Sequence, residues 1–316
     1  LTTISKIFYG FRGFEYSIEM AVELIHCIQK LSRDNPQIIE LDFNPVILTK
    51  SGLAVVDARI KKGEAVLETL GSLRKNRPHF FTNERLALIG VSSDSTKVGY
   101  AIAHNALGFT GELFLVNARG GELFGHRLYK SIGEIEGDID TAVIMIPSHF
   151  VIETIGELIS KNIKNIIIIS AGFKESGDYE SENVIANLAQ MHNFNVIGPN
   201  CLGYLESSKN LNATFGTGGL RSGELALLSQ SGAVLSALMD KAYDAGIGFS
   251  HLVSCGNMVD LDFSEMIDML NREASCKYIS IYAEGIKNGK EFLRAIRESS
   301  KKIYIFGGKI INFFYL

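Results

Sequence analysis

The hydrophobic pattern of the chain becomes regular near residue 86. From there on, short runs of aliphatic residues alternate with longer stretches in which apolar side chains recur every three or four positions. This alternation predicts parallel strands joined by crossover helices, and therefore an α/β fold. In the stretch 149–162, for example, Val151, Ile155, Leu158 and Ile159 fall on one helical face. The predicted strands are 86–91, 113–117, 141–147, 165–170, 195–200, 224–229, 250–256, 278–284 and 301–308.

A loop rich in Asn, Thr and Gly, residues 212–223, interrupts this rhythm and predicts a domain boundary. We therefore expect two doubly wound domains, at residues 81–211 and 223–316. The first 62 residues differ, because the strand-like runs 38–48 and 53–60 are separated only by a short turn segment with Gly52, which predicts a β-hairpin. The polar stretch 63–80 is expected to be a linker, in part helical.

Composition narrows the class of protein. A length of 316 residues suits two or three domains, and 46% hydrophobic with 21% charged residues is typical of soluble globular proteins. The net charge of -4 and the scattered Lys and Arg residues exclude a nucleic-acid footprint. Four isolated cysteines favour neither zinc nor disulfides and suit a reducing cytoplasm. No apolar run approaches the roughly 20 residues of a membrane helix. There is no recognisable signal peptide, and a first residue other than Met suggests that the sequence begins inside a longer protein.

The turn after the first regular strand is a candidate anion site. Gly90 ends the strand and Gly99 opens the next helix, and a helix N-terminus presents N–H groups to a phosphate. The segment lacks a full GxGxxG or Walker pattern, so an ordinary strand-to-helix connection is an equal alternative. Further hydrogen-bond donors in this turn are Ser92, Ser93, Ser95, Thr96 and Lys97.

A second strand–turn–helix segment, residues 227–234, repeats this arrangement. Ser229, Ser231 and Gly232 would face an anion at the start of the helix. The alternative is that Ser231 simply caps that helix, and both interpretations can hold together.

Carboxylates mark two further positions. Asp42 and Asn44 point to one side of a strand, with Asp57 on the returning strand, and such oxygen ligands suit Mg²⁺. From the residues alone, solvated surface acids are the favoured alternative. Glu284 follows a predicted parallel strand at the edge where α/β sheets bind ligands, so it could orient a histidine or could equally be a rim residue. None of the seven histidines has a catalytic context by spacing.

An ordered series of segments resembles one family, the acyl-CoA synthetases (NDP-forming), which includes ADP-forming acetate–CoA ligase and the succinyl-CoA synthetase superfamily. Residues 1–62, with FYGFRG and ELDFNP, are similar to the C-terminal end of its ATP-grasp domain. The resemblance implies a Rossmann-like CoA-binding domain followed by a flavodoxin-like parallel-sheet domain. The other matching segments are LALIGVSSDSTKVGYAIAHN, GFTGELFLVNARGGELFGHRLYKSI, DTAVIMIPSHFV, IIISAGFKESG, IGPNCLGY, LNATF, GELALLSQSGAV, GIGFSHLVSCGNMVDLDF and YISIYAEGIKNGKEFL.

The resemblance also implies roles for single residues. Ser229, Ser231 and Gly232 would hold the phosphate of a phosphohistidine loop, and Glu284 would contact that histidine. Mg²⁺ would be bound by Asn44 and Asp57, with ATP or ADP in the complete enzyme. The family more often has Pro at position 118 and Lys at position 119, so contacts there differ. The implied CoA-binding residues are Gly90, Ser92, Ser93, Thr96, Lys97, Val98, Val116, Asn117, Arg119, Ile146 and Pro147.

Two departures from the family pattern shape the functional hypothesis. The front of the ATP-grasp domain is not in the sequence, and residues 307–316 read GGKIINFFYL where the family has a Ser-His-Thr-Gly-like histidine loop. The relay in which histidine passes phosphate from an acyl phosphate to ADP is therefore not expected to run in this chain alone. We expect part of a ligase that interconverts acyl-CoA, ADP and phosphate with a small carboxylate such as acetate, CoA and ATP, with a companion subunit or oligomer supplying the rest of the ATP-grasp domain.

Three alternatives remain at this point. The chain could be a CoA-binding module without catalysis, or part of a fusion that acetylates protein lysines, although no acetyltransferase domain is visible. An NAD-dependent oxidoreductase is disfavoured, because no acidic residue closes the strand 113–117 to bind a ribose hydroxyl.

Overall fold

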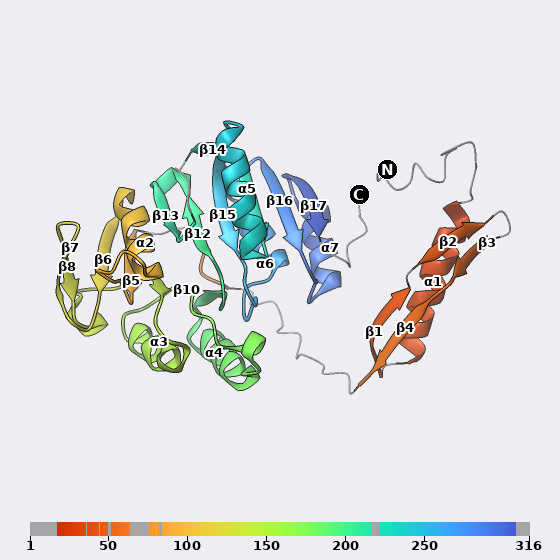
Figure 1. Cartoon of the computed structure of the whole chain (residues 1–316), viewed down its shortest axis with the longest axis horizontal. Helices are drawn as coiled ribbons and strands as arrows, with labels where there is room; N and C mark the ends of the chain where they lie inside the picture. The colour runs from red at the N-terminus through yellow and green to blue at the C-terminus, as the bar shows by residue number, and fades with distance from the viewer. Residues whose placement is uncertain are drawn as a thin grey trace. The chain divides into compact units, whose positions relative to one another are not determined.

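The computed structural model describes residues 18–35, 37–43, 45–49, 52–63, 76–81, 84–216 and 221–307 (Figure 1). The chain divides into two compact units, one made mainly of residues 1–72 and the other of residues 73–312. Each unit is described by itself.

The first unit contains one helix and two short ladders. Its elements are α1 (Ile18–Asp34), β1 (Ile38–Phe43), β2 (Val46–Thr49), β3 (Gly52–Val55) and β4 (Ala58–Lys62). Strand β1 pairs antiparallel with β4, and β2 pairs antiparallel with β3, so that Thr49 lies opposite Gly52. The hairpin predicted around Gly52 is confirmed.

The second unit begins with a seven-stranded sheet whose strand order is β11-β10-β9-β5-β6-β8-β7. Its strands are parallel except for β7, which runs antiparallel to β8. Because β6 lies on one side of β5 and β9 on the other, the carboxyl ends of β5 and β9 form a topological switch point. The elements of this part are β5 (Arg85–Ile89), α2 (Val98–Asn105), η3 (Ala106–Gly108), β6 (Glu112–Val116), β7 (Gly121–Leu123), β8 (His126–Tyr129), η4 (Ile132–Glu134), β9 (Thr141–Ile144), η5 (Ser148–Phe150), α3 (Val151–Ile159), β10 (Asn165–Ile168), η6 (Lys174–Ser176), α4 (Tyr179–His192) and β11 (Asn195–Ile197).

A six-stranded sheet with the order β13-β12-β15-β14-β16-β17 completes the second unit. Strands β14 to β17 are parallel, whereas β12 is antiparallel to both of its neighbours. Here β15 and β16 flank β14, which places a second switch point at the carboxyl ends of β14 and β16. The elements are β12 (Gly203–Glu206), η7 (Ser207–Lys209), β13 (Leu211–Thr214), β14 (Ser222–Ser229), α5 (Gly232–Asp244), β15 (Phe249–Ser254), α6 (Phe263–Leu270), β16 (Tyr278–Ala283), α7 (Gly289–Glu298) and β17 (Lys302–Gly307).

The predicted α/β class is confirmed, and so is each strand predicted from residue 86 onward. Helix α3 buries Val151, Ile155 and Leu158, as its periodicity predicts. Four short strands, β7, β8, β12 and β13, were not predicted. The strand β12 precedes the predicted domain boundary yet pairs with β15 of the second sheet, and residues 73–312 form one compact unit. The division at residues 211–223 therefore stays a prediction.

Residues 76–81, at the end of the predicted linker, belong to the packed core of the second unit. The side chains of Phe80 and Phe81 are buried, and their rings contact Tyr204 of β12 at centroid distances of 5.2 and 6.0 Å. The side-chain amide of Asn165 donates to the Phe80 carbonyl oxygen, and that of Asn195 donates to the Pro78 carbonyl oxygen. This segment therefore joins β10 and β11 of the first sheet to β12 of the second. The rest of the predicted linker, residues 64–75, lies outside the described residues.

The imidazole ring of His251 on β15 is fully buried. Its ring packs against Phe81 at 4.5 Å, and among the described residues neither ring nitrogen has a hydrogen-bond partner. Burial lowers the pKa of His251 to about 4, even though the Glu273 carboxylate, itself bonded to His79 at 2.5 Å, favours the charged form. The folded protein therefore keeps this imidazole neutral.

Acid is expected to destabilise the second unit through His251. Because the folded pKa lies below the unfolded value of about 6.5, stability is lost as pH falls from there towards 4, and the loss between pH 7 and pH 5 is about 2 kcal/mol. The measurement is urea denaturation of the protein and of His251→Met at both pH values. The stability difference between the two proteins should change by this amount, and an unchanged difference would show that His251 does not titrate in this range.

Candidate functional site

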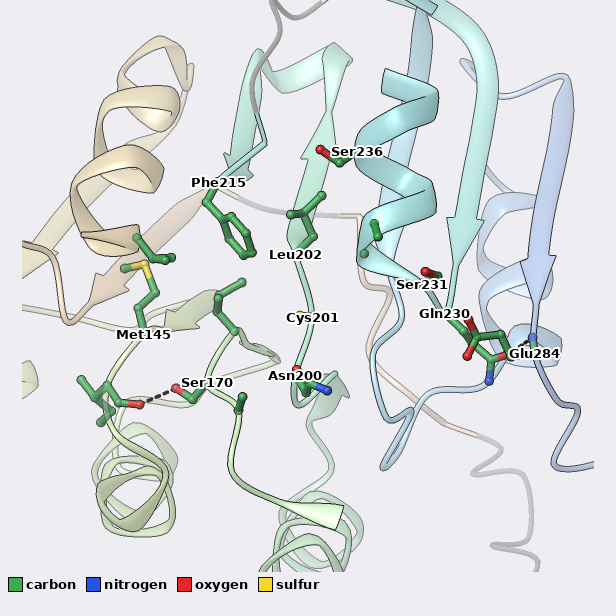
Figure 2. A pocket seen from close by; sticks show the side chains of 16 residues that line it. Met145, Ser170, Asn200, Cys201, Leu202, Phe215, Gln230, Ser231, Ser236 and Glu284 are labelled. Atoms are coloured by element: carbon green, nitrogen blue, oxygen red, sulfur yellow. Dashed lines mark hydrogen bonds between the residues drawn. The ribbon is translucent and has the colours of Figure 1, made fainter. Parts of the chain in front are cut away.

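The two switch points open onto one cavity of about 760 Å³ (Figure 2). Residues from the carboxyl edges of both sheets form its walls, which is where open α/β sheets bind ligands. The walls are Val98, Met145, Ile146, Ile169, Ser170 and Ala171 from the first sheet and its loops, Asn200, Cys201, Leu202 and Phe215 from the following segments, and Gln230, Ser231, Gly232, Ala233, Ser236 and Glu284 from the second sheet.

Gly90 closes β5 in a conformation that requires glycine. Its φ is +93°, and a Cβ atom there would lie 2.8 Å from both Ile146 Cγ2 and the Met145 carbonyl oxygen. A Cβ on Gly99 would in turn collide with the Gly90 carbonyl oxygen. The two glycines therefore let helix α2 start directly on the ends of β5 and β9.

Asp94 orders the loop between β5 and α2. Its carboxylate Oδ1 accepts from the backbone N–H and the hydroxyl of Thr96 at 3.0 and 2.7 Å, and these bonds hold the pKa of Asp94 below its usual range. The Asp94 N–H donates to Ser92 Oγ at 3.0 Å. Within the described residues no side chain caps α2 after Lys97, although the Tyr100 N–H donates to the Lys97 carbonyl oxygen at 3.0 Å. An uncapped helix N-terminus favours an anion.

Asn117, predicted to bind CoA, connects β6 to this loop. Its side-chain amide donates to the Val91 carbonyl oxygen at 2.6 Å, and its Oδ1 accepts from the Arg119 N–H at 2.8 Å. Of the predicted CoA-binding residues, Val98 and Ile146 line the cavity. The others do not line it: Gly90 and Val116 lie at strand ends, Ser92, Ser93, Thr96 and Lys97 in the loop after β5, Asn117 and Arg119 in the turn after β6, and Pro147 after β9. CoA binding by these residues stays a prediction.

The turn after β14 is built by its two serines. Ser229 is buried and its hydroxyl donates to the Ser231 carbonyl oxygen at 2.8 Å, while Ser231 Oγ accepts from the Val234 N–H at 3.4 Å. Ser231 therefore caps α5, and the capping interpretation is confirmed. Ser231 and Gly232 also line the cavity at the first turn of this helix, whereas Ser229 is engaged inside the turn. Anion binding by these residues stays a prediction.

Glu284 follows β16 and is held beside the end of β14. The backbone N–H groups of Glu284 and Gly285 donate to Gln230 Oε1 at 2.5 and 3.0 Å (Figure 2). Glu284 and Gln230 also line a second, smaller cavity of about 420 Å³. All seven histidines lie in the described part of the chain, and none of them lines either cavity.

Several wall residues were not found from the sequence. The Ser170 hydroxyl donates to the Ile146 carbonyl oxygen at 2.5 Å, and the Asn200 N–H donates to the Ser170 carbonyl oxygen at 2.9 Å. Burial raises the pKa of Cys201 to about 12, so its thiol stays protonated. The rule that led to Glu284, a polar residue at the carboxyl end of a parallel strand, would also have found Ser170 after β10 and Asn200 after β11.

The predicted magnesium ligands are not brought together by any described geometry. Asp57 is exposed just before β4, and Asn44 lies outside the described residues. Asp42 is exposed opposite Arg59 in the β1–β4 ladder. Within residues 18–307, where described, no group of three or more His, Cys, Asp or Glu residues could hold a metal ion. Magnesium binding stays a prediction. The described helices also include none that is long and apolar enough to cross a membrane.

Comparison with known proteins adds independent information. Family models match residues 1–61 (ATP-grasp domain), 84–206 (CoA binding domain) and 222–307 (succinyl-CoA ligase like flavodoxin domain). The ADP-forming acetate–CoA ligase of Methanocaldococcus jannaschii is 42% identical over 217 residues, which cover 69% of this chain and 31% of that enzyme. The α subunit of the ADP-forming acetate–CoA ligase II of Pyrococcus furiosus is 38% identical over 71% of this chain and 50% of the subunit.

A solved structure agrees with these matches. The dinucleotide forming acetyl-coenzyme A synthetase 1 of Candidatus Korarchaeum cryptofilum, in complex with phosphate and ADP, superimposes with a TM-score of 0.68 and 34% identity. The match covers 73% of this chain and 50% of that one. This chain thus spans 31% to 50% of the length of these relatives. It belongs to the NDP-forming acyl-CoA synthetase family, of which it carries the CoA-binding domain, the flavodoxin-like ligase domain and a segment matching the ATP-grasp domain.

Proposed function

We propose that this chain forms the CoA-binding and phosphate-handling part of a ligase that interconverts acyl-CoA, a nucleoside diphosphate and phosphate with a carboxylate, CoA and a nucleoside triphosphate. One observation carries the proposal: a single cavity connects the switch points of both sheets. A ligand bound at α2 can therefore extend its far end to the first turn of α5 and to Glu284. A long molecule with phosphates at one end and a reactive thiol at the other fits this arrangement.

The chemistry proposed for each end follows from the groups present. The diphosphate of CoA would lie at the first turn of α2, where backbone N–H groups and the helix dipole favour an anion. The aliphatic wall of Val98, Ile146, Ile169 and Leu202 suits the pantetheine arm. Free phosphate would lie at the first turn of α5, where it can attack the thioester carbonyl carbon, so that the CoA thiolate leaves and an acyl phosphate forms.

A histidine must then carry the phosphoryl group to the nucleoside diphosphate. Glu284 would orient its imidazole and stabilise its cationic form. We propose that this histidine and the remaining ATP-grasp residues come from the rest of the enzyme or from a companion subunit. Mg²⁺, if bound by Asn44 and Asp57, would neutralise charge on the nucleotide phosphates.

Calorimetry with the purified 316-residue chain tests the CoA site. We expect saturable heat with CoA and none with NAD, because the residue that closes β6 is Asn117 rather than an acid. Val98→Asp should weaken CoA binding by about tenfold or more, because it places a negative charge at the phosphate position. The matched control Val98→Asn has the same shape without the charge and should retain binding.

Two results would contradict the proposal. One is equal affinity of the Asp and Asn variants for CoA, and the other is binding of NAD as tight as that of CoA. Helix α2 should form in both variants, because either residue is favourable at a helix N-terminus. The same preparation is expected to form no ATP from acyl-CoA, ADP and phosphate, because no histidine among the described residues lines the cavities.

A further inference from the structure

Within the described residues, the six-stranded sheet ends at β17, which pairs with β16 and with no other strand. The Lys302 N–H donates to the carbonyl oxygen of Lys277, next to β16, at 3.3 Å. Because the backbone groups of successive residues point to opposite sides of a strand, those of Ile303 and Ile305 point away from β16. The outer edge of β17 therefore offers backbone N–H and C=O groups to a further strand.

One face of the sheet next to this edge carries no described helix. Helix α5 covers the same face over β14 and β15, where its residues cluster with Leu227 and Leu252 (Figure 1). The opposite face of β16 and β17 packs against α6 and α7. On the side of α5, Phe306 is partly buried against the cluster, whereas Tyr304 is 44% exposed and Tyr278 on β16 is 38% exposed. The outer part of the sheet thus ends in an exposed aromatic strip, and exposed tyrosines are typical of protein interfaces.

The sequence of β17 is complementary to a second copy of itself that runs in the opposite direction. About a twofold axis at Tyr304, Ile303 lies opposite Ile305 of the copy, and Lys302 lies opposite Phe306. The outward backbone groups of Ile303 and Ile305 then face each other, which is the hydrogen-bonded pair of an antiparallel ladder.

The side chains of such a pair are also compatible. Lys302, the one charged residue of β17, meets an aromatic ring rather than a second ammonium group. Tyr304 meets its own copy, and aromatic pairs across antiparallel strands are favourable. No like charges are opposed, so the strand has the charge complementarity that an interface between identical chains requires.

We propose that β17 is a dimerisation edge, at which a second copy of this chain pairs antiparallel about Tyr304 and joins the two six-stranded sheets into one. Strand β17 contributes no residue to the lining of the two cavities described above, so the inference does not depend on the proposed reaction. One pair of short strands buries less surface than a standard interface, and the dimer is therefore reversible, with a dissociation constant on the order of micromolar.

Sedimentation equilibrium on the 316-residue chain tests the proposal. Over concentrations from about 1 to about 100 micromolar, the mass should rise from 34.7 kDa towards twice that value. Tyr304→Lys should weaken the dimer by about tenfold or more, because it places two like charges together on the axis. Tyr304→Phe should keep it. The matched control Tyr278→Lys makes the same change on β16, on the same face but away from the edge, and should dimerise as the unaltered chain does.

A mixing experiment tests the position of the axis. An equal mixture of Tyr304→Lys and Tyr304→Glu should form a mixed dimer, because opposite charges meet only if residue 304 lies opposite its own copy. Thermal unfolding of each variant, followed by circular dichroism, should match that of the unaltered chain and so exclude a folding defect.

Four results would overturn the proposal. They are an unaltered chain that stays monomeric over the whole range, a dimer that survives Tyr304→Lys, a charge-swapped mixture that stays monomeric, and a chain that dimerises only after residues 309–316 are removed. The last result would identify residues 309–316, rather than a second copy, as the occupant of the edge.

Discussion

Replacing Arg77 with methionine is expected to lower the free energy of unfolding by about 3–5 kcal/mol, the cost of leaving buried charges without a partner. The Arg77 guanidinium contacts Asp260 Oδ2 at 2.9 Å and Glu265 Oε1 at 2.6 Å, and all three side chains are at most 11% exposed. Methionine has a similar length but no charge, so both carboxylates would remain buried beside an apolar group. Guanidinium denaturation of the variant and the unaltered protein measures the difference.

Arg127→Met is the matched control for this experiment. Arg127 pairs with Glu134 at 2.9 Å, but its side chain is 65% exposed, so the pair contributes only about 0–1 kcal/mol. An equal loss of stability in the two variants would show that burial of the Arg77 cluster contributes nothing.

Gly90→Ala is expected to lower the free energy of unfolding by about 2–5 kcal/mol, because left-handed strain and overpacking add at this position. The new methyl group would lie 2.8 Å from Ile146 Cγ2 and from the Met145 carbonyl oxygen, and it would push apart the ends of β5 and β9. CoA binding should weaken together with stability, since α2 starts from this point. Denaturation and CoA calorimetry on one preparation report both effects.

Gly125→Ala isolates the conformational part of this effect. Gly125, between β7 and β8, has a φ of +79°, and no described atom lies within 4 Å of its added Cβ. The expected cost is about 1–2 kcal/mol from the left-handed conformation alone, with unchanged CoA affinity. Equal losses of unfolding free energy in Gly125→Ala and Gly90→Ala would show that the contact of the new methyl group with Met145 and Ile146 does not contribute.

The regular strands could be predicted because burial on both faces makes them continuous apolar runs. The strands β9 and β10 are fully buried and read TAVI and NIII. The strand β7 is only three residues long and lies among Gly120, Gly121 and Gly125, so its sequence predicts a turn rather than a strand. Likewise, β12 and β13 follow the Gly-Pro-Asn turn at 198–200. β13 pairs with β12, and β12 pairs with β15, a contact that no local pattern encodes.

Site residues could be predicted from the sequence where they lie directly after a single strand. Gly90, Ser231 and Glu284 each follow a buried strand, and the rule that ligands bind at such ends applies to each separately. The role of Gln230 could not be predicted, because its side-chain oxygen accepts hydrogen bonds from two N–H groups just after β16, fifty-four and fifty-five residues away. The second, smaller cavity was missed for the same reason, since its walls come from the ends of five different strands.

The core position of residues 76–81 separates two definitions of a domain. The family model for CoA binding begins at residue 84, but Phe80, Phe81 and the Arg77 ion pairs lie before that point. A protein trimmed to the family boundary would keep every strand of the first sheet and still lose the aromatic rings that cover Tyr204 and His251. The segment matched by the family model is therefore shorter than the segment that packs as one core. A gene fusion cut at residue 84 would omit Phe80 and Phe81 and leave a cavity where the two sheets meet.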